Sequence, residues 1–117
     1  MTITIYHNPR CSKSRATLEI IQSKGITPNI VEYLHTPPDP DTLEKIARLI
    51  GVPLGELLRR DEDDFVAAGD DVPLDDETAL ARWLYEHPSV LERPIVVDDD
   101  NDRAIVGRPP KNVNAIL

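Results

Sequence analysis

The single cysteine of this chain, Cys11, lies in a polar and basic segment between an expected strand and an expected helix. Because the helix begins just after it, unpaired backbone N–H groups and the positive end of the helix dipole lie close to the sulfur. Arg10, Lys13 and Arg15 place cationic side chains nearby. All of these groups favour the thiolate over the thiol. The segment therefore predicts a nucleophilic cysteine beside a binding site for an oxyanion.

A lone cysteine can also be a small, unreactive core residue, and the sequence leaves this alternative open. The flanking residues Arg10 and Lys13 are unlike core residues. Cys11 and Ser14 form a C-x-x-S pattern where a dithiol oxidoreductase has a second cysteine. Any redox cycle must therefore take a thiol from outside the chain. The Ser14 hydroxyl could donate to the thiolate, or it could simply belong to the first helical turn.

Four further residues are candidates for the site. Arg59, Arg93 and Arg108 each lie at the end of an expected element. A planar guanidinium suits a tetrahedral oxyanion because it can hold two oxygens at once, although most single arginines only face solvent. His7 could tune the thiolate or donate a hydrogen bond, and a structural role is an equal alternative.

Other chemistries are not favoured. The histidines and the cysteine lack the spacing of a metal site, so no metal is expected. A cysteine phosphatase would need arginine where this chain has Thr17. The acidic run Asp98–Asp102 lacks the glycine of a calcium loop, since Arg103 occupies that position. We interpret this run as a solvated hairpin tip.

The composition points to one acidic, globular domain. The chain has 117 residues and a formal net charge of -8, which argues against nucleic acid and anionic membrane surfaces as partners. There is no apolar run of membrane-spanning length and no leader pattern at the start. One cysteine forms no internal disulfide, so we expect a cytoplasmic protein.

The expected elements are a strand at 2–6, a helix from Cys11 to Gly25, a strand at 30–34, helices at 43–50, at 52–60 and after residue 76, strands at 93–97 and 104–106, and a final helix. The acidic run at 61–64 is expected to be solvated, and no pattern extends from it to Val72. This order predicts an α/β fold with a thioredoxin-like mixed sheet. It is a single domain, residues 1–117, with a helical insertion at about residues 39–88. In that plan Arg93-Pro94 lies opposite Cys11, and its peptide bond is a candidate for the cis form.

Four motifs resemble one family over essentially the whole chain. They are His7-Asn8-Pro9-x-Cys11-x-x-Ser14-Arg15, Leu57-Leu58-Arg59, Arg93-Pro94-Ile95-Val96-Val97 and Gly107-Arg108-Pro109. In order and spacing they are similar to the glutaredoxin-coupled arsenate reductases, and the short length resembles the housekeeping members of that family.

The resemblance implies a catalytic cycle. The residue matching Cys11 attacks arsenate, those matching Arg59, Arg93 and Arg108 bind the oxyanion, and those matching His7 and Ser14 help to keep the thiolate. Glutathione then joins the enzyme-bound arsenic as a co-substrate, no cofactor stays bound, and glutaredoxin releases arsenite.

Two alternatives stay open. One is a glutathione-dependent oxidoreductase that acts on another oxyanion or on a glutathionylated substrate. The other is a non-enzymatic binding module like the polymerase-binding regulators of the same fold, although their usual C-x-x-C is absent here.

Overall fold

The protein is described by a computed structural model that covers residues 1–117. The chain forms two compact units, one of residues 1–36 and 93–117 and the other of residues 37–92. The helices and strands follow the sequence in this order: β1 Ile3–His7, α1 Ser12–Ser23, β2 Asn29–Glu32, α2 Pro40–Ile50, η1 Leu54–Leu57, α3 Asp63–Ala68, η2 Gly69–Asp71, α4 Glu77–Glu86, η3 Pro88–Val90, β3 Ile95–Asp98, β4 Arg103–Val106 and η4 Pro110–Ile116, where η marks a 3₁₀ helix. None of these helices is long and apolar enough to cross a bilayer.

The first unit is built on a four-stranded sheet with the order β2-β1-β3-β4. β1 and β2 are parallel, with His7 opposite Glu32, and α1 connects them, so the three elements form a βαβ unit. β3 runs antiparallel to β1, and β4 returns beside β3 as a hairpin. The predicted mixed α/β fold is therefore confirmed, and β1, which leads to Cys11, occupies the centre of the sheet.

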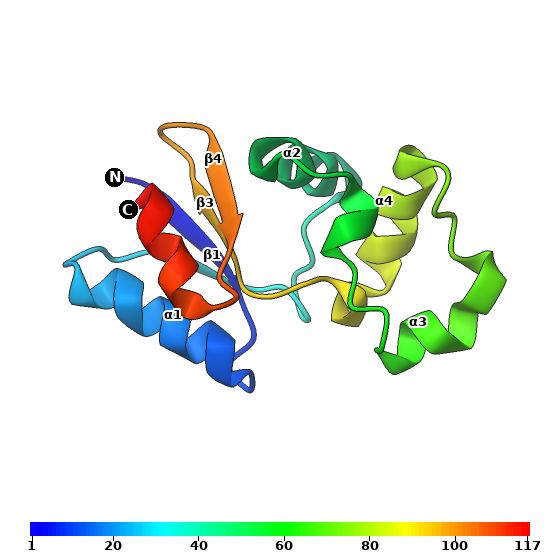
Figure 1. The fold of residues 1–117 in the computed structure, drawn as a ribbon, viewed down its shortest axis with the longest axis horizontal. Coiled ribbons are helices and arrows are strands. Elements are labelled where there is room, and N and C mark those ends of the chain that lie inside the picture. Colours follow the sequence, from blue (N-terminus) through cyan, green and yellow to red (C-terminus); the bar gives the residue numbers. More distant parts are fainter. The chain divides into compact units, whose positions relative to one another are not determined.

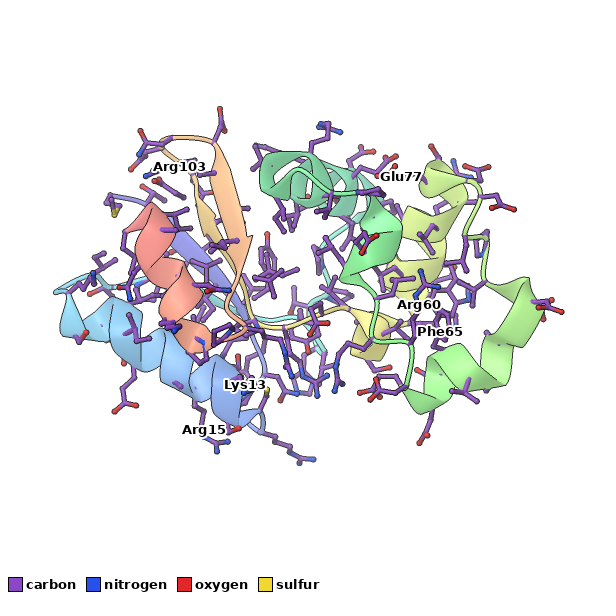
Figure 2. All side chains as sticks on the ribbon, in the orientation of Figure 1. Lys13, Arg15, Arg60, Phe65, Glu77 and Arg103 are labelled. Carbon is purple, nitrogen blue, oxygen red and sulfur yellow. The ribbon has the colours of Figure 1, made fainter.

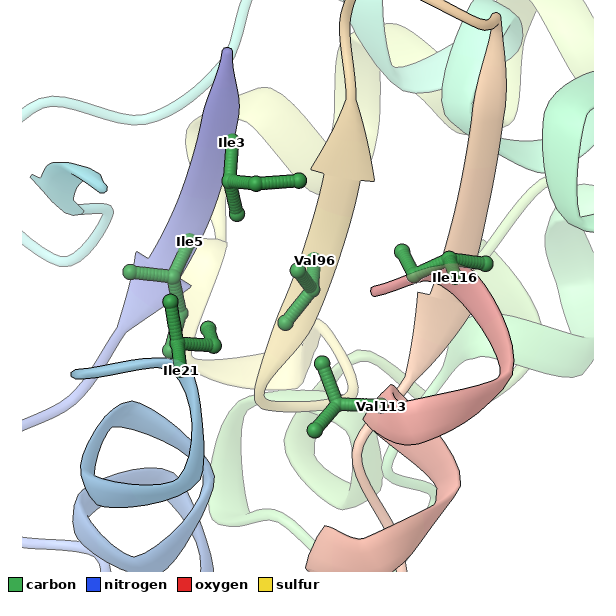
Figure 3. Close-up of a cluster of buried hydrophobic side chains, with 6 residues drawn as sticks. All are labelled: Ile3, Ile5, Ile21, Val96, Val113 and Ile116. Atoms are coloured by element: carbon green, nitrogen blue, oxygen red, sulfur yellow. The ribbon is translucent and has the colours of Figure 1, made fainter. Parts of the chain in front are cut away.

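The core of the first unit lies between this sheet and two helices. α1 and η4 lie side by side against one face (Figure 1). Apolar side chains from β1, α1, β3 and η4 meet there (Figure 3), namely Ile3, Ile5, Ile21, Val96, Val113 and Ile116. Burial of these aliphatic groups fixes α1 on the sheet, and so it fixes the start of α1 at the end of β1.

Three details of the first unit differ from the sequence predictions. β2 ends at Glu32, so Tyr33 lies in the turn that follows it. The final helix is 3₁₀ throughout. Asp98 is fully buried rather than solvated. Its carboxylate accepts hydrogen bonds from Arg103 Nη2 and Asn101 Nδ2, both at 2.9 Å, and these bonds hold the pKa of Asp98 below its ordinary value.

Gly107 lies where the turn after β4 passes closest to α1. A Cβ atom there would lie 2.6 Å from Thr17 Oγ1 and 2.9 Å from Pro94 Cγ. We therefore expect Gly107→Ala to lower the free energy of unfolding by about 1–3 kcal/mol, measured by urea denaturation. Gly55→Ala is the control, because the nearest atom to its Cβ would be 3.8 Å away. Equal stability of the two variants would contradict the prediction.

The second unit is helical. Asp39 caps α2 by accepting the Thr42 backbone N–H at 2.8 Å, and Asp76 caps α4 in the same way through Ala79 at 3.2 Å. The unpatterned stretch after residue 61 contains the short helix α3, which the sequence prediction missed. It packs by aromatic contacts: the Phe65 ring meets Trp83 edge to face, and the Arg60 guanidinium lies 5.7 Å from the Phe65 ring centre. Figure 2 shows Arg60 and Phe65 next to each other.

Candidate active site

The loop from β1 to α1 places Cys11 directly before the first helical turn. The Cys11 backbone N–H donates to the Asn8 carbonyl at 3.0 Å, and the Arg10 N–H donates to Asn8 Oδ1 at 3.0 Å, which closes the loop. Cys11 itself has extended backbone angles, and its carbonyl accepts the Arg15 N–H at 3.0 Å as the first helical bond. The side chain of Cys11 is thus carried by the residue that precedes the free N–H groups of α1.

The pKa of the Cys11 thiol is lowered. Partial burial alone would raise it, but the backbone N–H groups of Ser14 and Lys13 and the guanidinium of Arg93 all bond the sulfur and favour the thiolate. Cys11 is half-buried. The inert-core alternative therefore does not describe this residue: the sulfur is accessible, and the groups around it favour the thiolate over the thiol.

The cations next to Cys11 in the sequence play a smaller part than expected. Lys13 acts on the sulfur through its backbone N–H rather than its ammonium group. The Arg15 guanidinium donates to the Pro9 carbonyl at 2.9 Å. Figure 2 shows Lys13 and Arg15 at the start of α1, where both are exposed. The cation that contacts the thiolate instead comes from a segment eighty-odd residues away, Arg93.

Ser14 acts through two different groups. Its hydroxyl is fully buried, lies 2.7 Å from His7 Nδ1 and accepts the Asn8 backbone N–H at 3.0 Å. Its backbone N–H, not its hydroxyl, is the donor to the Cys11 sulfur. The sequence proposal that the Ser14 hydroxyl donates to the thiolate is therefore replaced by a structural role: the hydroxyl ties the end of β1 to the first turn of α1.

His7 is buried at the end of β1. Burial lowers its pKa, the Glu32 carboxylate opposes this, and Arg15 adds to the lowering. With a pKa below the ordinary histidine value, the ring is neutral at pH 7. His7 therefore supports the site by hydrogen bonding through Ser14 and does not supply a positive charge to the thiolate.

We expect Ser14→Ala to destabilise the protein, because it leaves the Asn8 N–H and His7 Nδ1 buried without this partner. The expected loss is about 1–3 kcal/mol in the free energy of unfolding, measured by denaturant titration. Ser12→Ala, at an exposed position of the same turn, is the control and should have little effect. The Cys11 pKa should stay lowered in Ser14→Ala, since the donor is a backbone group. A return to the ordinary cysteine pKa would mean that the hydroxyl is the donor after all.

Arg93 and Arg108 come together at the start of β3 and the end of β4. The Arg108 Nη1 group donates to the Arg93 carbonyl at 3.2 Å, and the Gly107 N–H donates to the Pro94 carbonyl at 2.9 Å. The peptide bonds Arg93-Pro94 and Arg108-Pro109 are both cis. The candidate cis bond is thus present, and the two arginines share one corner of the sheet, with Arg93 reaching the Cys11 sulfur.

Tyr33 is a residue of the site that the sequence analysis missed. Its ring is fully buried, and its phenol oxygen and Arg93 Nε are both excluded from solvent. Burial lowers the pKa of Arg93, and this is outweighed by Tyr33 and Cys11, which each interact with the guanidinium. Tyr33 and Cys11 therefore interact with the same guanidinium group, that of Arg93. A tyrosine at the end of an apolar strand gives no sign of this contact in the sequence.

Because Tyr33 helps to hold the guanidinium against the sulfur, Tyr33→Phe should raise the Cys11 pKa above the wild-type value. The variant keeps the ring and its packing and removes only the hydroxyl. The measurement is the absorbance of the thiolate as a function of pH. Tyr85→Phe, at an exposed position, is the matched control. Identical titration curves for both variants would show that the Tyr33 hydroxyl does not position Arg93.

Arg59 belongs to the other unit, residues 37–92. There its guanidinium pairs with the Glu62 carboxylate, and its backbone N–H donates to the Val90 carbonyl. It follows η1 rather than ending a helix, because η1 stops at Leu57. Of the six predicted site residues, the first unit therefore holds Cys11, His7, Ser14, Arg93 and Arg108 together.

A βαβ unit, a β-hairpin and a single cysteine at the start of the first helix define a protein of the thioredoxin-like class. The ArsC family model matches residues 6–116, and the chain belongs to the ArsC family. It is similar to the arsenate reductase of Neisseria meningitidis, with 45% identity over 116 residues that cover 98% of this chain and 97% of the relative. It is also 42% identical over 117 residues to the "Uncharacterized protein YfgD" of Escherichia coli, covering 98% of this chain and 96% of the relative.

Solved structures agree with the fold. The structure of the arsenate reductase from Vibrio cholerae superposes with a TM-score of 0.87 at 38% identity, covering all of this chain and 98% of the other.

Proposed function

We propose that this protein reduces arsenate to arsenite with Cys11 as the nucleophile. The observation that carries the proposal is the half-buried Cys11 sulfur, which receives hydrogen bonds from two backbone N–H groups and from Arg93. Relatives of similar length bear the name arsenate reductase. A thiolate next to guanidinium groups is suited to attack a tetrahedral oxyanion, because the cations stabilise the negative charge on the oxygens as the bond forms.

In the first step the Cys11 sulfur forms a bond to arsenic, and one arsenate oxygen leaves as water after taking up protons. Arsenic stays pentavalent in this step. Arg93 and Arg108 hold the remaining oxygens, and the N–H groups at the start of α1 add further donors. The contribution of Arg59 to this oxyanion-binding site stays a prediction from the family resemblance.

Reduction needs two electrons from thiols, and the chain offers no second cysteine. In the proposed cycle glutathione bonds to the arsenic and displaces a second oxygen as water. A glutaredoxin thiolate then attacks the glutathione sulfur, so the electron pair of the sulfur–arsenic bond passes to arsenic, which becomes trivalent. The products are a glutathione–glutaredoxin mixed disulfide and trivalent arsenic on Cys11, and water releases the latter as arsenite. Such a cycle belongs to the reducing cytoplasm, where these thiols are kept reduced.

The test is arsenite formation by the purified protein with arsenate, glutathione and glutaredoxin, measured by chromatographic separation of the two arsenic species. We expect turnover that needs all components. Parallel reactions in which thioredoxin replaces glutaredoxin identify the electron donor. If no reaction yields arsenite above the protein-free background, the arsenate assignment is wrong.

A second assay tests whether the site prefers an oxyanion other than arsenate. Oxyanions that occupy the site should slow alkylation of Cys11 by iodoacetamide, because they cover the sulfur. A panel of arsenate, phosphate, sulfate and selenate ranks them. Stronger protection by another oxyanion than by arsenate would favour the alternative oxidoreductase.

A further inference from the structure

A hollow opens at the ends of the two parallel strands, next to the loop that leads to Cys11. It has a volume of about 200 Å³, and its walls are the loop after β1 and the turn after β2. The lining residues are His7, Asn8, Pro9, Arg10, Glu32, Leu34 and His35. All of them belong to the first unit. No step assigned so far to Cys11, Arg93 or Arg108 uses this space.

The lining combines both signs of charge with an apolar surface. Arg10 and Glu32 are exposed and carry opposite charges on different elements. Leu34 is 41% exposed and adds an apolar surface to the lining. A ligand with both a carboxylate and an ammonium group matches this lining better than a simple anion does, because an anion would be repelled by Glu32.

The hollow also continues along the edge of the sheet. A neighbouring depression is lined by Ile30, Val31, Glu32, His35 and Thr36, so the two share Glu32 and His35 as a common wall. β2 is an edge strand and pairs only with β1. The combined trough offers room for an extended ligand of a few residues, with unpaired strand backbone along one side.

The position of the trough relative to the sulfur completes the argument. β1 leads to Cys11, Arg93 and Arg108 come from the β3 and β4 side, and the trough lies on the β2 side. The cysteine needs an outside thiol because the chain contains no other. Arg10, the residue before Cys11, lines the trough, and Arg93 and Arg108 do not, so a ligand in the trough does not compete with an oxyanion for these two arginines.

We infer that this trough binds the thiol co-substrate, a short peptide that carries a thiol together with a free carboxylate and a free ammonium group. Arg10 binds its carboxylate, Glu32 binds its ammonium group, and Leu34 covers its aliphatic portion. The inference rests on the proposed function, since only a reaction at Cys11 requires such a ligand.

Direct binding tests it without any turnover. The probe is S-methylglutathione, which keeps the charges of glutathione but cannot react, added to ¹⁵N-labelled wild-type protein and followed by NMR. We expect the largest amide shifts in residues 7–10 and 32–36, saturating with one dissociation constant. Shifts centred on residues 93–94 and 107–109, or none at millimolar probe, would overturn the inference.

Variants localise the binding. Glu32→Gln and Arg10→Gln should each raise the dissociation constant of S-methylglutathione about three- to fivefold, as expected for the loss of one exposed charge contact. Glu19→Gln and Arg82→Gln, exposed positions away from the trough, are the matched controls. If the trough variants and the control variants raise the dissociation constant equally, the effect comes from the change in net charge, and the proposed site is wrong.

The two proposals fail in different ways. Binding in the trough without arsenite formation would leave the co-substrate site standing and reject arsenate as substrate. Arsenite formation with no binding in the trough would do the reverse.

Discussion

Replacement of Cys11 by serine is expected to abolish arsenate reduction, with a fall of at least about three orders of magnitude in kcat/KM. A serine hydroxyl stays protonated at neutral pH even where backbone N–H groups and Arg93 stabilise an anion. The chain has no second thiol that could substitute. The measurement is arsenite formed per enzyme under the conditions in which wild-type protein turns over.

A pH titration of stability separates this chemical loss from misfolding. Because the Cys11 pKa is lowered in the folded state, the thiolate stabilises the wild type fully above the ordinary cysteine pKa. This contribution is lost as pH falls through the lowered value. Cys11→Ser should unfold cooperatively and lack this pH-dependent increment. Residual activity in Cys11→Ser near the wild-type level would mean that another group attacks the substrate.

Replacement of Arg93 by alanine is the second large effect. The guanidinium bonds the Cys11 sulfur and lies beside Arg108, so its loss removes a stabilising contact from the thiolate and from the oxyanion together. We expect kcat/KM for arsenate to fall about 100-fold, the usual cost of one charged donor at a developing anion. The pH midpoint of Cys11 alkylation should move upward at the same time.

Arg93→Lys distinguishes charge from geometry. Lysine keeps the positive charge but cannot form the two parallel hydrogen bonds of a guanidinium. We expect it to recover part of the Cys11 pKa shift and little of the arsenate affinity. Arg82→Ala, on the exposed side of α4, is the control for the loss of one arginine. An unchanged alkylation profile in Arg93→Ala would show that the backbone N–H groups alone hold the thiolate.

Much of the fold follows from local patterns in the sequence. Alternating apolar residues at β1 and the helical period after Cys11 predict a strand followed by a helix. The two apolar segments at β3 and β4, separated by an acidic turn, predict the hairpin. These features depend on nearest neighbours and on which face is buried. Asp39 and Asp76 act as helix caps because a carboxylate can reach the N–H groups of the next turn. The short α3 has no fully buried residue and packs only through Phe65, so its sequence carried no apolar period to detect.

The sequence by itself determined that Cys11 stands at a helix start with free N–H groups nearby, because this depends only on residues within one turn. Which cation touches the sulfur was decided by the tertiary structure. Arg10, Lys13 and Arg15 are close along the chain, yet Arg93 makes the contact, since β3 pairs beside β1 and the direction of each side chain depends on that register. The contact of the buried Tyr33 with Arg93 and the trough between the loop after β1 and the turn after β2 are likewise products of strand pairing across the sheet, which no local pattern encodes.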